Sequence, residues 1–303
     1  CSHLADMLAR AKCVIVEVNQ NLPWVYGLTG TEINIQDVTY VVEGDNPPIA
    51  QLGAGGPATE VDKAVANLVV PQIPNGACLQ LGIGGMPNTV GALIAESDLK
   101  DLGCWTGTIS DAFLAIHKAG KLTNARKEVD AGYSTWNLAM GSQELYDWLE
   151  NEPELFYPGD VDHVHSPERM GKMSNFISIN GGVQLDLMGQ ENAESAGSRQ
   201  LSGIGGQMDF LEGAFRSRGG RGYICINSSR RDKEGNLKSN IVPTIPGGST
   251  ISVPRTMVEC VATEYGVAHL HGLSLGERAA AMAAIAHPDF REELYKYAQE
   301  NFY

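Results

Sequence analysis

Short apolar runs alternate along the chain with segments whose apolar residues recur at helical spacing. Residues 77–81 form a compact apolar run typical of a buried strand, and residues 60–70 before them have an amphipathic helical pattern. The same reasoning predicts strands at 13–18, 38–43, 135–140, 176–180, 183–187, 223–227, 250–253 and 258–263. It predicts helices at 2–12, 88–95, 112–119, 143–149, 275–285 and 288–297. This alternation indicates an α/β protein with an open mixed sheet and flanking helices, and with a hairpin-like turn at Gly181 and Gly182.

The chain opens with the predicted helix at 2–12, and the predicted strand at 13–18 follows it at once. This opening is typical of the end of a domain whose earlier strands lie elsewhere. The glycine-rich run at 53–57 has the composition of a linker. We therefore expect a short first unit followed by a larger second one.

Composition and charge exclude some classes of function. The 303 residues are 43% hydrophobic and 19% charged, and their net charge is −14. An acidic surface repels nucleic acid and anionic membranes, so we expect neither as a main partner. We also expect no membrane span, because no apolar run approaches roughly 18 to 20 residues, and no signal peptide. The six cysteines lack CxxC and Cys/His ligand spacings, which predicts free thiols, a reducing cytoplasm and no metal site, and the apolar runs around Cys78, Cys225 and Cys260 predict that these three are buried.

Two glycine-rich loops indicate a binding site. Residues 82–87 (Gly-Ile-Gly-Gly-Met-Pro) follow a predicted strand and precede a predicted helix, an arrangement that presents backbone N–H groups to an anion. Taken alone, this loop could equally be a tight turn without a ligand. Residues 203–210 (Gly-Ile-Gly-Gly-Gln-Met-Asp-Phe) contain the second loop. We expect the two loops to hold a large anionic ligand, and segment 102–111 between them to carry the groups that act on it.

Two polar segments add weaker candidates. Residues 228–235 place two arginines and a lysine in an acidic chain, which suggests a phosphate contact or simply a charged hairpin turn. His163 and His165 would point to one face of an extended segment, as metal ligands can, although a surface loop is the favoured interpretation.

An ordered series of short stretches carries a more specific signal. These stretches are residues 14–19, 79–87, 140–142, 178–180, 189–195, 201–210, 241–243, 261–267 and 285–291. Together they resemble the acyl-CoA:carboxylate CoA-transferases of the acetyl-CoA hydrolase/transferase family, such as the butyryl-CoA:acetate and 4-hydroxybutyrate enzymes. The resemblance covers essentially the whole chain.

The resemblance implies two similar open α/β domains with the active site between them. Residues 1–54 would be the end of an N-terminal CoA-transferase-like domain whose first part has no counterpart here, and residues 55–303 would be the C-terminal CoA-transferase domain. The resemblance also implies coenzyme A, an acyl-CoA and a small carboxylate as reactants in the cytoplasm. It further implies a homodimer, or a hetero-oligomer with a chain that supplies the remaining N-terminal part.

In this family a glutamate takes the acyl group and then carries CoA as a thioester, within a motif like His-Thr-Glu-Met-x-Ser-Asp. Residues 105–111 read Trp-Thr-Gly-Thr-Ile-Ser-Asp, so the resemblance places Gly107 at the glutamate position. It implies that the backbone N–H groups of Gly84 and Gly85 stabilise the oxyanion. The residues implied to contact CoA are Gly82, Ile83, Gly84, Gly85, Met86, Gly182, Gly206 and Arg231.

Three functions stay open at this point. The chain could be a CoA-transferase-family enzyme that binds CoA or acyl-CoA and whose chemistry is altered by Gly107. It could instead be a non-catalytic CoA-binding subunit of a hetero-oligomeric CoA-transferase, or an acyl-CoA hydrolase. Glu191 could be a relocated acid or base, although a surface glutamate is the favoured interpretation, and Cys104 is a weak nucleophile candidate because its neighbours predict burial.

Overall fold

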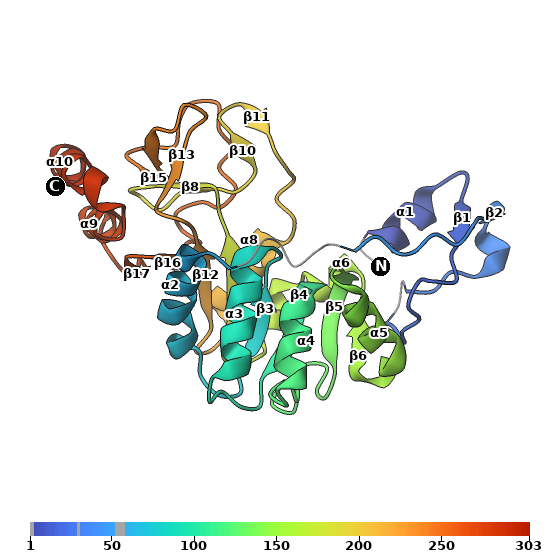
Figure 1. Ribbon diagram of the computed structural model, residues 1–303. Coiled ribbons are helices and arrows are strands. Elements are labelled where there is room, and N and C mark those ends of the chain that lie inside the picture. Colours follow the sequence, from blue (N-terminus) through green and yellow to red (C-terminus); the bar gives the residue numbers. More distant parts are fainter. Residues whose placement is uncertain (1–2, 29–30, 52–57) are drawn as a thin grey trace.

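An eight-stranded sheet forms the centre of the protein. The structure is a computed structural model that describes residues 3–28, 31–51 and 58–303. In spatial order the sheet runs β17-β16-β12-β7-β3-β4-β5-β6 (Figure 1). Its strands are β3 (Cys78–Leu81), β4 (Gly103–Ile109), β5 (Ser134–Ala139), β6 (Phe156–Pro158), β7 (Phe176–Gly181), β12 (Arg221–Cys225), β16 (Cys260–Thr263) and β17 (Gly266–His269). Neighbouring strands are parallel except for β16 and β17, which confirms the predicted mixed α/β sheet.

Helices cover both faces of the sheet because successive side chains of a strand point to opposite faces. On β12, Tyr223 joins a core that includes residues of α2 (Glu60–Val69), α3 (Gly85–Glu96) and α4 (Asp111–Lys118), which lie side by side in Figure 1. Its neighbour Ile224 joins a second core with Leu211 of α8. The remaining helices of eight or more residues are α5 (Gln143–Asn151), α8 (Gln207–Arg216), α9 (Leu275–Ala284) and α10 (Pro288–Phe302). Within the described ranges, no helix is long and apolar enough to cross a bilayer.

Short strands outside the main sheet occupy the long connections after β7 and β12. They are β8 (Gln184–Asp186), β9 (Glu191–Asn192) and β15 (Ile241–Val242) in one small sheet, with hairpins β10 (Ser195–Ala196)–β11 (Arg199–Gln200) and β13 (Ser229–Arg231)–β14 (Leu237–Ser239). The predicted hairpin at Gly181 and Gly182 is wrong, because β8 pairs with β15 and β9 whereas β7 pairs with β3 and β12. The predicted strand at 250–253 is also wrong, since it makes only an isolated bridge between Val253 and Glu191.

The N-terminal segment projects away from the main sheet (Figure 1). It contains α1 (Leu4–Arg10) and a two-stranded parallel sheet of β1 (Ile15–Val18) and β2 (Tyr40–Glu43), so the predicted helix and both predicted strands are present. Apolar side chains on this small sheet are largely exposed, 64% for Ile15 and 62% for Tyr40. The predicted linker at 53–57 lies outside the described residues, and the domain boundary after residue 54 stays a prediction.

The order of the strands reverses between β3 and β7. β4, β5 and β6 follow β3 on one side, and β7, β12 and β16 lie on the other side. In open parallel sheets, ligands bind outside the carboxyl ends of the strands at such a switch point. The glycine loop after β3 and Gly182 after β7 therefore stand where the fold favours a ligand.

Candidate functional site

The first glycine loop turns β3 directly into α3. Gly84 caps the helix with a φ of 108°, in the left-handed region that favours glycine, and α3 begins at Gly85 rather than at the predicted Asn88. The backbone N–H groups of Gly85 and Met86 thus belong to the first helical turn, where no intrahelical carbonyl accepts them. This end of the helix can bind an anion through those groups and through the helix dipole.

The carboxyl ends of β3 and β7 are joined by a buried polar network. The Ser178 hydroxyl and the Asn180 amide both donate to the Gln80 Oε1 atom, at 2.6 and 3.0 Å. The Gly82 N–H donates to the Ile179 carbonyl at 2.9 Å. These bonds hold the first glycine loop against the end of β7, so the two sides of the switch point are fixed relative to each other.

The second glycine loop leads into α8 and packs against His165. A Cβ atom added to Gly206 would lie 2.2 Å from His165 Cε1 and 2.7 Å from Phe210 Cε2. Glycine at this position is therefore required by the imidazole and phenyl rings. The structure shows Gly206 as a packing position, and its contact with CoA stays a prediction.

Gly107 on β4 faces the same group of side chains. Alternation along β4 points Trp105 and Gly107 to the face covered by α8, and Trp105 joins the core that contains Phe210. A Cβ atom at Gly107 would lie 3.1 Å from Phe210 Cε2 and 3.4 Å from His165 Nε2. The structure thus brings Gly107 and Gly206, 99 positions apart by number, to the two sides of one imidazole ring.

His163 and His165 have different partners. They flank the end of the short helix α6 (Val161–Val164), where His163 Nε2 lies 2.7 Å from Asp130 Oδ2 and His165 Nδ1 lies 3.4 Å from Asp209 Oδ2. Their side chains are only 15% and 17% exposed, so the favoured surface-loop interpretation is wrong. In the described part of the chain, no group of three His, Cys, Asp or Glu residues is arranged to hold a metal.

A polar network behind Trp105 fixes the backbone between the two histidines. The Trp105 indole donates to the Val164 carbonyl at 2.7 Å and stacks on the His163 ring. Burial alone would raise the pKa of Asp130, but the hydrogen bond and charge of His163 hold it below its ordinary value. The nearby Lys127 ammonium donates to two carbonyls and to the Thr135 hydroxyl, and burial lowers its pKa.

Glu191 lies on the other side of the second glycine loop and is fully buried. The Gln207 amide donates to both carboxyl oxygens of Glu191 at 2.9 Å, and burial raises the pKa of Glu191 to about 8 although these bonds oppose the shift. A Cβ atom at Gly182 would lie 2.4 Å from Glu191 Oε1. The favoured interpretation of Glu191 as a surface residue is therefore wrong. The Gly181 and Gly182 pair was the one sequence signal for it, because the absent side chain at 182 leaves the space that the carboxyl group fills.

The surroundings of Cys104 and Arg231 show no role for either residue at the glycine loops. Cys104 is fully buried and burial raises the pKa of its thiol, so it is not poised as a thiolate nucleophile. Arg231 is exposed on the β13–β14 hairpin and donates to the Gly235 carbonyl at 2.8 Å within its own turn. The charged-hairpin alternative is thus the observed structure, and a contact of Arg231 with CoA phosphates stays a prediction.

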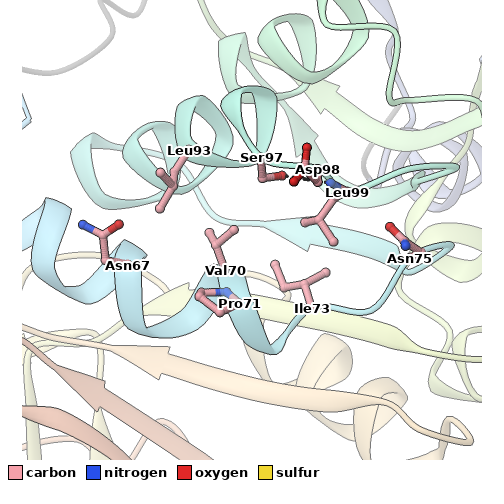
Figure 2. A pocket seen from close by; sticks show the side chains of 9 residues that line it. All are labelled: Asn67, Val70, Pro71, Ile73, Asn75, Leu93, Ser97, Asp98 and Leu99. Atoms are coloured by element: carbon pink, nitrogen blue, oxygen red, sulfur yellow. Dashed lines mark hydrogen bonds between the residues drawn. The ribbon is translucent and has the colours of Figure 1, made fainter.

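A separate cavity of about 370 Å³ lies at the opposite end of α3 (Figure 2). Its lining residues are Asn67, Val70, Pro71, Ile73, Asn75, Leu93, Ser97, Asp98 and Leu99. They come from the end of α2, the segment before β3 and the end of α3, so they face the amino end of β3. Because α3 begins at the first glycine loop and is 12 residues long, roughly 18 Å separate this cavity from that loop.

The fold and the loops define an α/β protein with glycine-rich loops at the switch point of a mostly parallel sheet. Comparison with known proteins specifies this class further. The acetyl-CoA hydrolase/transferase C-terminal domain matches residues 141–298, and the N-terminal domain of the same family matches residues 1–52. The chain belongs to the acetyl-CoA hydrolase/transferase family.

The chain is similar to several CoA-transferases and to a protein of known crystal structure. A butyryl-CoA:acetate CoA-transferase from Anaerostipes caccae is 52% identical over 299 residues, which cover 99% of this chain and 67% of the relative. A 4-hydroxybutyrate coenzyme A transferase from Clostridium kluyveri is 40% identical, covering 96% of this chain and 66% of the relative. The crystal structure of RipA from Yersinia pestis superposes with a TM-score of 0.89 at 35% identity, covering 99% of this chain and 66% of RipA. The chain thus spans about two thirds of the length of these proteins.

Proposed function

We propose that this chain binds CoA thioesters at the switch point and that its chemistry does not pass through a glutamate at position 107. Binding is supported by the N–H groups of Gly85 and Met86 in the first turn of α3, which have no intrahelical acceptor, and by the network that fixes the loop against β7. The names of the relatives support an acyl-CoA and a small carboxylate as the reactants.

The observation that carries the altered chemistry is the packing around Gly107. No carboxylate stands there, and Phe210 and His165 lie 3.1 and 3.4 Å from where a Cβ atom would be. A side chain at this position would need the Phe210 ring to shift by a few tenths of an ångström and would touch the His165 ring. The nearby Glu191 is sealed from solvent and held by Gln207, so it does not replace the missing nucleophile as a covalent group.

The test is a trapping experiment on the whole chain. The protein is incubated with acetyl-CoA or butyryl-CoA, treated with borohydride or hydroxylamine, and mapped by peptide mass spectrometry. Binding of CoA is measured in parallel by calorimetry. We expect CoA to bind and every glutamate to stay unmodified. A glutamyl adduct at any position would overturn the altered chemistry, and absence of binding would overturn the proposed function itself.

The exposed N-terminal sheet supports a second candidate, a CoA-binding subunit of a hetero-oligomer. Apolar side chains of β1 and β2 such as Ile15 and Tyr40 are more than half exposed, which suits contact with another chain. The glutamate would then come from that partner. Purification of the native protein distinguishes the two, because a stoichiometric partner that carries the His-Thr-Glu motif supports the subunit and a single species supports independent chemistry.

A further inference from the structure

The imidazole of His165 stands between Gly107 and α8. Its Nε2 atom lies 3.4 Å from the position of a Cβ atom at Gly107, and its Nδ1 atom lies 3.4 Å from Asp209 Oδ2. The side chains of His165 and Asp209 are 17% and 45% exposed. The two ring nitrogens therefore have different surroundings. Nδ1 lies beside a carboxylate, and Nε2 lies beside Gly107 on β4, where the family chemistry is expected.

Asp209 influences which nitrogen of the His165 ring carries the proton. A carboxylate beside Nδ1 favours the tautomer that carries its proton there, which leaves the Nε2 lone pair facing Gly107. His163, two positions before His165, is paired instead with Asp130 at 2.7 Å. Asp209 from α8 is thus the carboxylate that orients His165.

The surroundings hold this ring in place. Gly206 lies against one side, since a Cβ atom there would be 2.3 Å from His165 Nδ1, and the Phe210 ring packs at 4.8 Å. The hydrogen bond from Trp105 to the Val164 carbonyl fixes the backbone next to His165. Four different elements, β4, α6, the second glycine loop and α8, thus converge on one partly exposed imidazole.

We propose that His165, oriented by Asp209, is the general base that activates water against a CoA thioester bound beside Gly107. This inference rests on the proposed function. The water oxygen attacks the thioester carbonyl carbon while its proton passes to Nε2 of His165. The C–S bond then breaks, the proton passes to the leaving sulfur, and the products are a free carboxylic acid and CoA. No redox partner or metal is needed, because the proton and the water supply the whole balance.

The test measures acyl-CoA hydrolysis and CoA binding side by side. His165→Ala is expected to lower kcat by about 100-fold or more, with KM changed less than about threefold, because general-base groups contribute on this scale. Added imidazole is expected to restore part of the rate in His165→Ala and to leave the wild type unchanged. Asp209→Asn tests the orienting role at a half-exposed position, and we expect it to lower kcat less than His165→Ala does.

His271→Gln, at an exposed histidine whose ring packs on Phe215 near the end of α8, is the matched control and should hydrolyse as the wild type does. If the wild type binds CoA but releases no acid, the general base is refuted while the proposed binding function stands. If His165→Ala and Asp209→Asn hydrolyse at the wild-type rate, the assignment is equally refuted. If the wild type fails to bind CoA, the proposed function falls and this inference falls with it.

Discussion

The two sides of the second glycine loop place similar chemistry in opposite environments. On the Gly206 side, His165 is partly exposed and paired with a half-exposed Asp209. On the Gln207 side, Glu191 is fully buried and held by one amide. The comparison teaches that a titratable group near the site is not reactive for that reason alone. A group exchanges protons with water only if it is exposed to solvent. Of these two groups, His165 is partly exposed and Glu191 is not.

The largest expected effect is a pH dependence of the free energy of unfolding, caused by the buried Glu191. Burial raises the pKa of Glu191 from its ordinary 4.5 to about 8. Between these values the unfolded chain has lost this proton and the folded chain keeps it. The free energy of unfolding therefore falls as pH rises, by about 1.4 kcal/mol per pH unit, and the contribution is level below and above this window. Glu191→Gln removes this slope.

Urea unfolding of wild type and Glu191→Gln at intervals from about pH 5 to about pH 8 measures the slope. We expect the variant to gain stability relative to the wild type as pH rises. A constant difference between the two proteins across this range would show that Glu191 is ionised in the folded state.

The next effect concerns the glycine that contacts His165. Gly206→Ala would place a Cβ atom 2.2 Å from the ring, so we expect a loss of about 3 kcal/mol together with a displaced imidazole. Gly203→Ala is the control in the same loop, because a Cβ atom there has nothing within 4 Å. Thermal or urea unfolding compares the two variants. Equal stability would mean that the ring is free to move away from the loop.

A smaller effect is expected at Gly182. A Cβ atom there would lie 2.4 Å from Glu191 Oε1, so Gly182→Ala should cost about 2 kcal/mol. In a Glu191→Ala background the same change should cost about 1 kcal/mol less, since the opposing atoms are gone. Gly181→Ala is the matched control, with its nearest atom 3.9 Å away. Additive effects in the double variant would contradict the proposed contact between 182 and the carboxyl group.

The smallest effect on stability is expected at Gly107. Gly107→Ala brings a Cβ atom to 3.1 Å from Phe210, and we expect a cost of about 1 kcal/mol. Binding of CoA should persist, and hydrolysis should fall because the methyl group fills the space that faces Nε2. Calorimetry and a thiol-release assay measure the two. Faster hydrolysis in Gly107→Ala would show that this space is not where water is activated.

Local patterns predicted β3, β5, β7, β12 and β16 of the main sheet, but not β4, β6 or β17. The run at 77–81 corresponds to β3 and the segment 275–285 to α9. Both were predictable because an apolar run and helical spacing are patterns of residues close together in the sequence. The turn at Gly181 and Gly182 failed because β8 pairs with β15, more than 50 positions away, and a glycine pair does not reveal that partner. The sequence pattern therefore predicts elements better than their partners.

In the candidate site, too, features formed by neighbouring residues were predictable and contacts between distant residues were not. The first glycine loop is local, and its position between β3 and α3 follows from the residues themselves. The pairing of His165 with Asp209 and of Glu191 with Gln207 depends on α8 packing against both, which no spacing along the chain discloses. Glu191 and His165 were consequently both interpreted as surface residues, and the burial of Glu191 and the partly enclosed position of His165 became visible only in three dimensions.

The network that joins β3 to β7 also bears on how the protein folds. Gln80 and Asn180 are separated by 100 positions, so the carboxyl ends of β3 and β7 meet only after a long loop has been closed. Contacts of this range form slowly, and the strands that they join stay unprotected until then. A ligand that bridges the two strand ends recognises only the finished sheet, and it should therefore protect the chain from proteolysis without speeding its folding.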